Sequence, residues 1–235
     1  NYDFSEMNSE MLGELNASHT GGGYIHSDPK GDKTASLGIF WDMSYEGEGI
    51  KISEIMDKSP LSRTENEIKK GFIIEAIDGN KIKADEDIFK YLNHKAGKNT
   101  VLLIRDTEKN KTFKEIVKPI SIGKQYALLY ERWVENRRDE TEKLSGGKIG
   151  YVHVKGMNSS SFRKVYHDLL GKTYHKEAVI IDTRYNHGGW LHDDLATLFS
   201  GQKYVTFIPR GQKFGHDPMT KWIKPSILLM SEGNY

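Results

Sequence analysis

The sequence contains no cysteine among its 235 residues. This absence excludes disulfide bonds, a thiol nucleophile and thiolate-bound metal ions, but it does not identify a compartment, because secreted proteins can also do without cysteine. Long apolar runs are absent too: no segment approaches the roughly 20 apolar residues of a membrane-spanning helix. We therefore expect a soluble protein without membrane insertion, and the residues do not decide between the cytoplasm and the periplasm.

An excess of charge of one sign is also absent. The 34 lysine and arginine residues balance 33 aspartate and glutamate residues, for a formal net charge of +1. Nucleic-acid binding and membrane-surface binding both use a large patch of one sign. We therefore expect no nucleic-acid partner, and we interpret the mixed charges at 137–143 as a solvated helix face.

The two ends of the sequence lack the features of a complete chain. The first residue is Asn1 rather than a methionine, and the last residues, M-S-E-G-N-Y, follow an apolar strand directly. We therefore expect the chain to be a piece of a longer protein.

The first segment, residues 1–32, is short and polar apart from one helical pattern. Apolar residues recur at helical spacing over 5–15, with Ser5 as the expected N-cap, and the glycine run 21–23 ends the pattern. Residues 26–36 are rich in turn formers, which predicts a linker.

The second segment, residues 33–122, has the pattern of a compact β-rich domain. Short apolar runs alternate with turn signals such as Asp78-Gly79-Asn80, and one helix is expected at 84–94. The strands are expected at 37–41, 49–55, 72–77, 100–105 and 112–117.

The third segment, residues 123–235, alternates between helices and strands. A long helix at 124–143 is expected to end at Ser145-Gly146-Gly147. Apolar strands that alternate with helices imply parallel pairing and right-handed crossovers. The strands are expected at 148–154, 178–184, 203–208 and 226–231, with a serine-capped helix at 160–170 and another at 191–199. The predicted fold class is α/β (or α+β), with a parallel or mixed sheet and an inserted β-rich domain.

The stretch S-L-G-I opens the β-rich domain. Leu37, Gly38 and Ile39 can present successive backbone amides, because glycine lets a ligand approach the main chain. Together with S-P-L at 59–61 and I-D-G at 77–79, this order resembles a PDZ domain, and the resemblance implies binding of an extended peptide and its carboxylate. From the residues alone, ordinary turns of a β-rich domain remain the alternative.

The stretch I-D-T-R-Y-N-H-G-G-W-L-H at 181–192 leads from a buried strand through two glycines into a helix. Amides at a helix N-terminus stabilise a developing negative oxygen. The amide of Gly189, with that of Gly188, is therefore a candidate oxyanion hole. A tight turn without a catalytic role is the alternative.

Histidines and aspartates in and after this stretch raise the question of a metal. His187 and His192 are five residues apart, however, whereas paired helical metal ligands lie four residues apart on one face. Asp193 and Asp194 do not restore that spacing. We expect no metal site and no cofactor.

His19 is the candidate general base. It lies between the end of a helix and the glycine run, where it can face a cleft and a nucleophile. Ser18 is an unsuitable nucleophile for it, because the side chains of adjacent residues diverge. We interpret Ser18 as a supporting hydroxyl.

Together these elements resemble the tricorn-type serine peptidases, within the wider S41 group of C-terminal-processing peptidases. Four features in the order of the family carry the resemblance across essentially the whole chain: S-H-T after an N-terminal helix, the PDZ-like module, W-V-E-N-R-R…G-K-I-G-Y-V-H-V, and I-D-T-R-Y-N-H-G-G-W-L. The resemblance implies that His19 is the general base, that Ser18 belongs to its supporting network, and that Gly189 contributes to the oxyanion hole.

The resemblance also implies residues beyond this sequence. The nucleophilic serine is expected just after Tyr235 and the supporting glutamate further downstream, so this piece is expected to be inactive by itself. Ser231 and Glu232 are not taken as substitutes, because Ser231 comes several residues early and nothing independent supports Glu232.

The functional hypothesis is a serine endopeptidase that hydrolyses peptide bonds of oligopeptides or unfolded segments through an acyl-enzyme. The alternative is a catalytically dead, PDZ-type module that binds peptide C-termini; a histidine-dependent metal hydrolase has little in its favour. The expected partner is a peptide or unfolded protein, and the ring-like assemblies of the family imply a homo-oligomer. Cleavage specificity is not predicted, although Asp217 is a candidate contact for a basic substrate residue, with capping of its own turn as the alternative.

Overall fold

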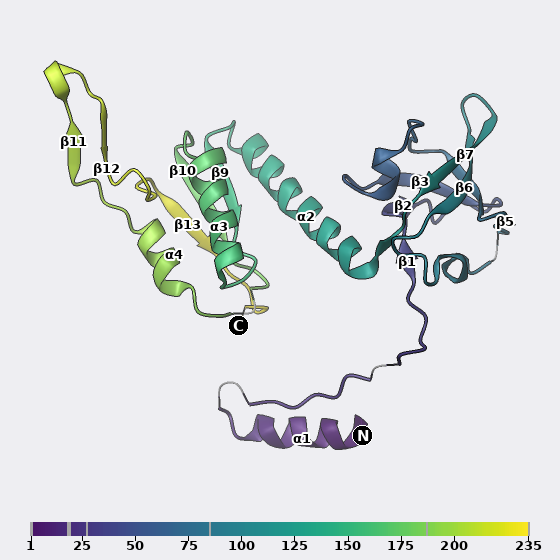
Figure 1. Ribbon diagram of the computed structural model, residues 1–235. Coiled ribbons are helices and arrows are strands. Elements are labelled where there is room, and N and C mark those ends of the chain that lie inside the picture. Colours follow the sequence, from purple (N-terminus) through teal and green to yellow (C-terminus); the bar gives the residue numbers. More distant parts are fainter. Residues whose placement is uncertain (1, 18–19, 27, 85, 187, 235) are drawn as a thin grey trace. The chain divides into compact units, whose positions relative to one another are not determined.

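The computed structural model describes residues 2–17, 20–26, 28–84, 86–186 and 188–234 (Figure 1). The chain divides into two compact units, one of Asn1–Glu54 with Arg63–Ile122 and the other of Ile55–Ser62 with Gly123–Tyr235. Helices occur together with several sheets, one of them parallel. This confirms the predicted mixed α/β fold class.

The first unit begins with the helix α1 (Tyr2–Glu14). It starts before Ser5, so the prediction that Ser5 caps it is wrong. None of its described residues is buried, and Met7 and Met11 are exposed. The apolar residues whose spacing predicts this helix, such as Met7 and Met11, therefore lie on an exposed surface in the described part of this unit.

A six-stranded sheet forms the body of the first unit. Its strand order is β2-β3-β4-β6-β7, with β5 paired to β4, and the pairings from β3 to β7 are antiparallel. In β6 every second residue is buried, as expected for a strand with one face on the core. The strands are β2 (Ile39–Trp41), β3 (Ile50–Ile55), β4 (Ile73–Ile77), β5 (Asn80–Lys81), β6 (Thr100–Asp106) and β7 (Lys111–Val117).

Two short strands join the ends of this β-rich domain. β1 (Ala35–Ser36) pairs antiparallel with β8 (Ile120–Ser121). The linker expected at 26–36 therefore ends in a strand, so the prediction of a linker is wrong for its last two residues, Ala35 and Ser36. A 3-10 helix, η1 (Pro60–Arg63), precedes β4.

The helix expected at 84–94 is a five-residue 3-10 helix, η2 (Ile88–Leu92), in the described residues. It begins where the carboxylate of Asp87 accepts a hydrogen bond from the N–H of Phe89 at 2.9 Å. It has ended by His94, whose φ of 59° is incompatible with a right-handed helix. The apolar spacing predicts a turn of helix correctly but not its short length.

The second unit is built on a parallel sheet with the strand order β13-β10-β9, as the apolar strand runs predict. Its hydrophobic core joins this sheet to two helices through residues such as Val152, Val165, Val179 and Leu195. The elements are α2 (Ile122–Leu144), β9 (Ile149–His153), α3 (Ser159–His167), the π-helix η3 (Asp168–Lys172), β10 (Ala178–Asp182), α4 (His192–Phe199) and β13 (Ser226–Leu229).

α2 is the long helix predicted at 124–143. It ends where Gly147, with φ of 80°, donates its N–H to the carbonyl of Glu142 at 2.8 Å. Glycine adopts this left-handed conformation without steric cost, which makes it a common helix terminator. Neither α2 nor another helix in the described ranges is long and apolar enough to cross a membrane.

The helix α3 begins at a different cap from the one expected. The N-cap is Asn158, whose Oδ1 accepts a hydrogen bond from the N–H of Ser161 at 3.0 Å, so the prediction of a serine cap is wrong. Asparagine and serine are both favourable N-caps, because each offers a short side-chain oxygen to the free amides of the first turn.

The strand expected at 203–208 lies outside the parallel sheet. β11 (Val205–Phe207) pairs antiparallel with β12 (Gly215–Asp217), and η4 (Pro209–Gly211) lies in their connection. The two strands extend as a hairpin beyond the sheet (Figure 1). The prediction of a strand is confirmed here, but the parallel pairing implied for it is wrong.

Candidate active site

The carboxyl ends of the three parallel strands meet at one side of the sheet, the carboxyl edge. Asp182, the last residue of β10, is in register with His153 of β9 and with Leu229 of β13. Ligands of open α/β sheets bind outside this edge, among the loops that follow the strands. Two such segments leave from it: residues 183–186 with 188–191, the edge loop, and residues 230–234, the end segment.

Asp182 is completely buried, with 0% of its surface exposed. Its carboxylate accepts hydrogen bonds from the Tyr151 hydroxyl at 2.7 Å and from Nε and the main-chain N–H of Arg184 at 3.0 and 2.9 Å. Burial alone would raise the pKa of Asp182, but these hydrogen bonds lower it. Asp182 is therefore a charged anchor for the start of the edge loop.

His153 lies next to Asp182 and is also buried. Its Nδ1 is 2.8 Å from the Tyr130 hydroxyl, and its Nε2 is 3.1 Å from the carbonyl oxygen of Arg184. The ring of Trp133 stands edge-on to it, with 5.0 Å between the ring centroids. Burial lowers the pKa of His153 and raises the pKa of Tyr130 to about 12, so both side chains are uncharged at neutral pH.

Asn186 holds the centre of the edge loop and is only 2% exposed. Its Nδ2 donates to the carbonyl of Val154 at 2.8 Å, and its main-chain N–H donates to the carbonyl of Thr183 at 3.0 Å. Beside it, Tyr185 has φ of 61°, a conformation that few non-glycine residues adopt. Such strain persists only where the surroundings determine the backbone, which is common at functional sites.

The two predicted glycines lie in the edge loop with φ of 76° for Gly188 and 132° for Gly189. The N–H of Gly188 donates to Oδ1 of Asn186 at 2.9 Å, so it is already bound. Gly189 forms an isolated parallel bridge with Met157, and a Cβ at this position would lie 2.7 Å from the Met157 carbonyl oxygen. Both glycines therefore permit a backbone path that a larger residue would obstruct or strain.

The helix expected at 191–199 is α4 (His192–Phe199), with Leu191 as its N-cap, so the prediction of this helix is confirmed. Gly189 lies two residues before the N-cap and outside the first turn. The helix dipole acts within the first turn, and it therefore does not account for an oxyanion hole at Gly189. The role of the Gly189 amide as oxyanion donor stays a prediction.

The end segment returns to the edge loop. Nδ2 of Asn234 donates to the carbonyl of Thr183 at 2.6 Å, and Oδ1 of Asn234 accepts from the N–H of Ser231 at 2.9 Å. A Cβ on Gly233 would lie 3.0 Å from the ring of Tyr185. The end segment and the edge loop therefore lie side by side at the carboxyl edge.

Ser18 and His19 lie outside the described residues. The nearest described neighbours are Ala17 and Thr20, and the hydroxyl of Thr20 donates to the carbonyl of Ala17 at 2.7 Å. The roles of His19 as general base and of Ser18 as its support stay predictions.

The histidines and aspartates near α4 do not form a metal site in the described part of the chain. His187 lies outside the described residues. Nε2 of His192 is 3.6 Å from a carboxylate oxygen of the exposed Asp193. In the described ranges, no three histidine, aspartate or glutamate side chains gather as metal ligands would.

The predicted peptide-binding residues lie in the first unit. Leu37, Gly38 and Ile39 are buried, and Gly38 has φ of 69°. The N–H of Gly38 donates to Oγ of Ser36 at 2.9 Å. A peptide carboxylate would have to displace that hydroxyl, and binding at these three residues stays a prediction.

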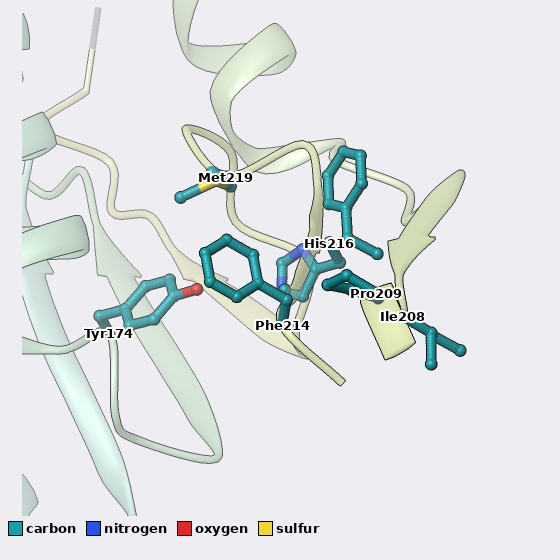
Figure 2. A pocket seen from close by; sticks show the side chains of 8 residues that line it. Tyr174, Ile208, Pro209, Phe214, His216 and Met219 are labelled. Carbon is teal, nitrogen blue, oxygen red and sulfur yellow. The ribbon is translucent and has the colours of Figure 1, made fainter. Parts of the chain in front are cut away.

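A pocket of about 610 Å³ lies at the β11–β12 hairpin. Figure 2 shows the side chains of Tyr174, Phe214 and Met219 among the apolar groups that line it. Tyr174 precedes β10 in the chain, toward the amino end of that strand. None of the residues that line the pocket belongs to the edge loop or the end segment, so the pocket is separate from the carboxyl edge.

Sequence reasoning identified the two glycines of the edge loop and missed the side chains that hold them. His153 and Asp182 are polar residues that end apolar parallel strands, and this position is a recognisable signal of a site at a sheet edge. Tyr130 and Asn234 carry no comparable signal, because their partners lie 23 and 51 residues away in the sequence.

Comparison with families of known proteins finds two matches. Residues 148–235 match the model described as peptidase family S41, and residues 43–121 match the model described as the tricorn protease PDZ domain.

Two curated relatives extend this result over more of the chain. The chain is 30% identical over 199 residues, 81% of its length, to a tricorn-like protease C-terminal subunit of Sulfurisphaera tokodaii. It is 26% identical over 237 residues, 97% of its length, to a tricorn protease homolog of Saccharolobus solfataricus. The chain covers 22% and 21% of these two proteins, so it spans about a fifth of their length.

A solved structure shares the fold. The crystal structure of the tricorn protease superimposes with a TM-score of 0.77 at 22% sequence identity, covering 95% of this chain and 22% of that one. The family resemblance seen in the sequence is thereby confirmed: residues 43–121 are a PDZ domain of the tricorn protease type, and residues 148–235 belong to peptidase family S41.

Proposed function

We propose that the chain is part of a serine endopeptidase that hydrolyses peptide bonds of oligopeptides or unfolded protein segments through an acyl-enzyme. The observation that carries this proposal is the contact between Asn234 and Thr183, which brings the end segment beside the edge loop with its two glycines. Two relatives that bear the name of a protease point to the same activity.

The chemistry assigns one role to each predicted residue. His19 accepts the proton of the nucleophilic serine, and Ser18 supports the imidazole. The amide of Gly189 stabilises the tetrahedral oxyanion; Gly188 can assist only if its bond to Asn186 breaks. We propose that the serine lies beyond residue 235, so that residues 1–235 alone are inactive. The reaction requires no cofactor.

The proposed organisation has three parts: residues 1–32 carry Ser18 and His19, residues 33–122 form the PDZ-like domain, and residues 123–235 belong to the peptidase core. The family matches at 43–121 and 148–235 support the last two parts. A homo-oligomer is proposed from the family resemblance alone, and sedimentation velocity of the full-length protein tests it.

The activity is tested by labelling the full-length protein with a phosphonate directed at active-site serines. We expect one labelled serine, located by peptide mapping beyond Tyr235. His19→Ala should abolish labelling, because the serine is then no longer deprotonated by a general base. His26→Ala is the matched control, since His26 belongs to the same N-terminal segment and has no proposed role.

Three outcomes decide the matter. Labelling that requires His19 but not His26 supports the peptidase. An absence of labelling in a folded full-length protein contradicts it, as does labelling that His19→Ala leaves unchanged.

A further inference from the structure

Three elements of the second unit meet at the imidazole of His153. Tyr130 and Trp133 reach it from α2, and the carbonyl of Arg184 reaches it from the edge loop. His153 itself ends β9. A histidine that is 7% exposed thus connects a helix, a strand and the loop that carries the two glycines.

The two hydrogen bonds determine where the ring carries its hydrogen. A carbonyl oxygen can only accept, so Nε2 of His153 must donate to Arg184. Burial lowers the pKa of His153 and favours the neutral imidazole, which carries one hydrogen. Because that hydrogen is on Nε2, Nδ1 has none and accepts from the hydroxyl of Tyr130.

The carbonyl that receives this hydrogen bond controls the turn of the edge loop. It belongs to the peptide plane between Arg184 and Tyr185, and rotation of that plane changes φ of Tyr185. This φ is 61°, in the left-handed region that is unfavourable for a tyrosine. The Nε2–H of His153 is fixed opposite the Arg184 carbonyl, and its hydrogen bond stabilises this orientation of the peptide plane over one in which φ of Tyr185 is relaxed. The turn then places Asn186, which holds Val154 and the N–H of Gly188.

We propose that His153 is a positioning residue of the candidate active site, and that its Nε2–H holds the Arg184 carbonyl and with it the turn that sets the path of Gly188 and Gly189. Tyr130 keeps the other ring nitrogen satisfied and the ring in place. The effect on catalysis rests on the proposed peptidase function, whereas the effect on the edge loop can be measured without any activity.

Two substitutions of His153 distinguish the contribution of its Nε2–H donor from that of the side chain's size. Glutamine is long enough to place an amide nitrogen near the position of Nε2, whereas asparagine reaches only the position of Nδ1. His153→Asn should therefore release the turn, and His153→Gln should hold it. Hydrogen exchange of the full-length protein, followed by mass spectrometry on peptides covering 183–191, measures this release. Peptides covering 100–117 in the other unit serve as the internal reference.

We expect exchange in the edge loop to become about tenfold faster or more in His153→Asn, the effect of losing one buried hydrogen bond, and to stay near the wild-type rate in His153→Gln. A second pair covers the case in which His153→Asn does not fold. Tyr130→Phe should accelerate exchange in the edge loop, and Tyr126→Phe, which alters an exposed tyrosine of the same helix, should not.

Equal exchange in His153→Asn and His153→Gln would overturn the proposal, as would equal exchange in Tyr130→Phe and Tyr126→Phe. In an active enzyme, His153→Asn should lower kcat with little change in KM, and His153→Gln should restore it. An inactive full-length protein would contradict the proposed function, and the exchange measurements would still decide the role of His153.

Discussion

At the scale of single residues, the charge of Asp182 is central to the carboxyl edge. Its carboxylate is buried, and the charged form is the one that Tyr151 and Arg184 stabilise. Hydrogen bonding holds the folded-state pKa below the usual value of about 4 although burial opposes this. The resulting stability is fully present above the unfolded-state pKa and is lost as pH falls through the folded-state pKa.

Replacing this carboxylate should reveal that dependence. We expect Asp182→Asn to lower the free energy of unfolding by about 2–4 kcal/mol at pH 7, because an amide group then faces Arg184 in a buried site. Below pH of about 4 the difference from the wild type should shrink, since the wild-type carboxylate itself becomes protonated. Urea unfolding of the full-length protein at several pH values measures both effects. Asp193→Asn, at an exposed carboxylate, is the control, and a difference that does not depend on pH would contradict the argument.

Gly189 of the edge loop has little space for a side chain. It has φ of 132°, and a Cβ at this position would lie 2.7 Å from both Cβ and the carbonyl oxygen of Met157, so the restriction is conformational and steric. We expect Gly189→Ala to cost about 2–3 kcal/mol of unfolding free energy, measured by urea denaturation. Gly123→Ala in α2 is the control; it has open space and should be neutral or slightly stabilising. Similar effects of the two variants would exclude a special role for the Gly189 backbone.

At the scale of elements, α3 depends on a cap that its own sequence did not reveal. Asn158 accepts hydrogen bonds from the N–H of Ser161 at 3.0 Å and from the hydroxyl of Ser160 at 2.6 Å. Asn158→Ala should therefore lower the free energy of unfolding by about 1 kcal/mol, whereas Ser159→Ala, at an exposed neighbour, should change it little. Thermal unfolding monitored by circular dichroism compares the two. Equal midpoints would show that the cap contributes nothing measurable.

The sequence predicts well those elements in which burial determines where the apolar residues lie along the chain. The first four residues of β10 are apolar because it is the central strand of a parallel sheet, and α2 is followed by glycines that take positive φ. The strand expected at 203–208 defeats the same reasoning, because β11 pairs with β12 in a separate two-stranded sheet. An apolar run specifies burial or pairing, but it does not specify the partner.

The candidate site follows the same division. Gly188 and Gly189 could be found from the sequence, because two glycines after a buried strand indicate a backbone that must approach another group closely. The hydrogen bond from the N–H of Gly188 to Asn186 could not be found from the sequence, because loop geometry decides whether a given amide is bound or free. The sequence pattern places Tyr130 in a helix and predicts nothing more, because its contact with His153 arises from tertiary packing.

At the scale of the whole molecule, the chain joins a segment that matches the tricorn protease PDZ domain to a segment that matches peptidase family S41, and it spans about a fifth of the length of its relatives. The two parts have different chemistry available to them. The carboxyl edge presents a strained loop fixed by buried polar groups, whereas the PDZ loop keeps the amide of Gly38 bound to Ser36.

The last prediction concerns peptide binding by the PDZ domain, and substitution of Ser36 tests it. A peptide carboxylate needs the N–H of Gly38, but in the structure that N–H donates to the hydroxyl of Ser36 at 2.9 Å. In addition, the ring of Phe89 packs against Trp41 on the edge strand β2, with 5.8 Å between the ring centroids. The wild type should therefore bind a peptide with a free C-terminal valine weakly. Ser36→Ala removes the competing acceptor and should tighten binding about tenfold, as isothermal titration calorimetry of the full-length protein can measure.

The matched control for this titration is the same peptide with an amidated C-terminus. It cannot offer a carboxylate and should bind both proteins equally weakly, because the Gly38 amide discriminates by charge. Tight binding of the free-acid peptide by the wild type would show that the carboxylate readily displaces the Ser36 hydroxyl from the Gly38 N–H. Such a result would support peptide capture as a function. Unchanged binding in Ser36→Ala would instead show that the loop around Gly38 is not the place where peptides bind.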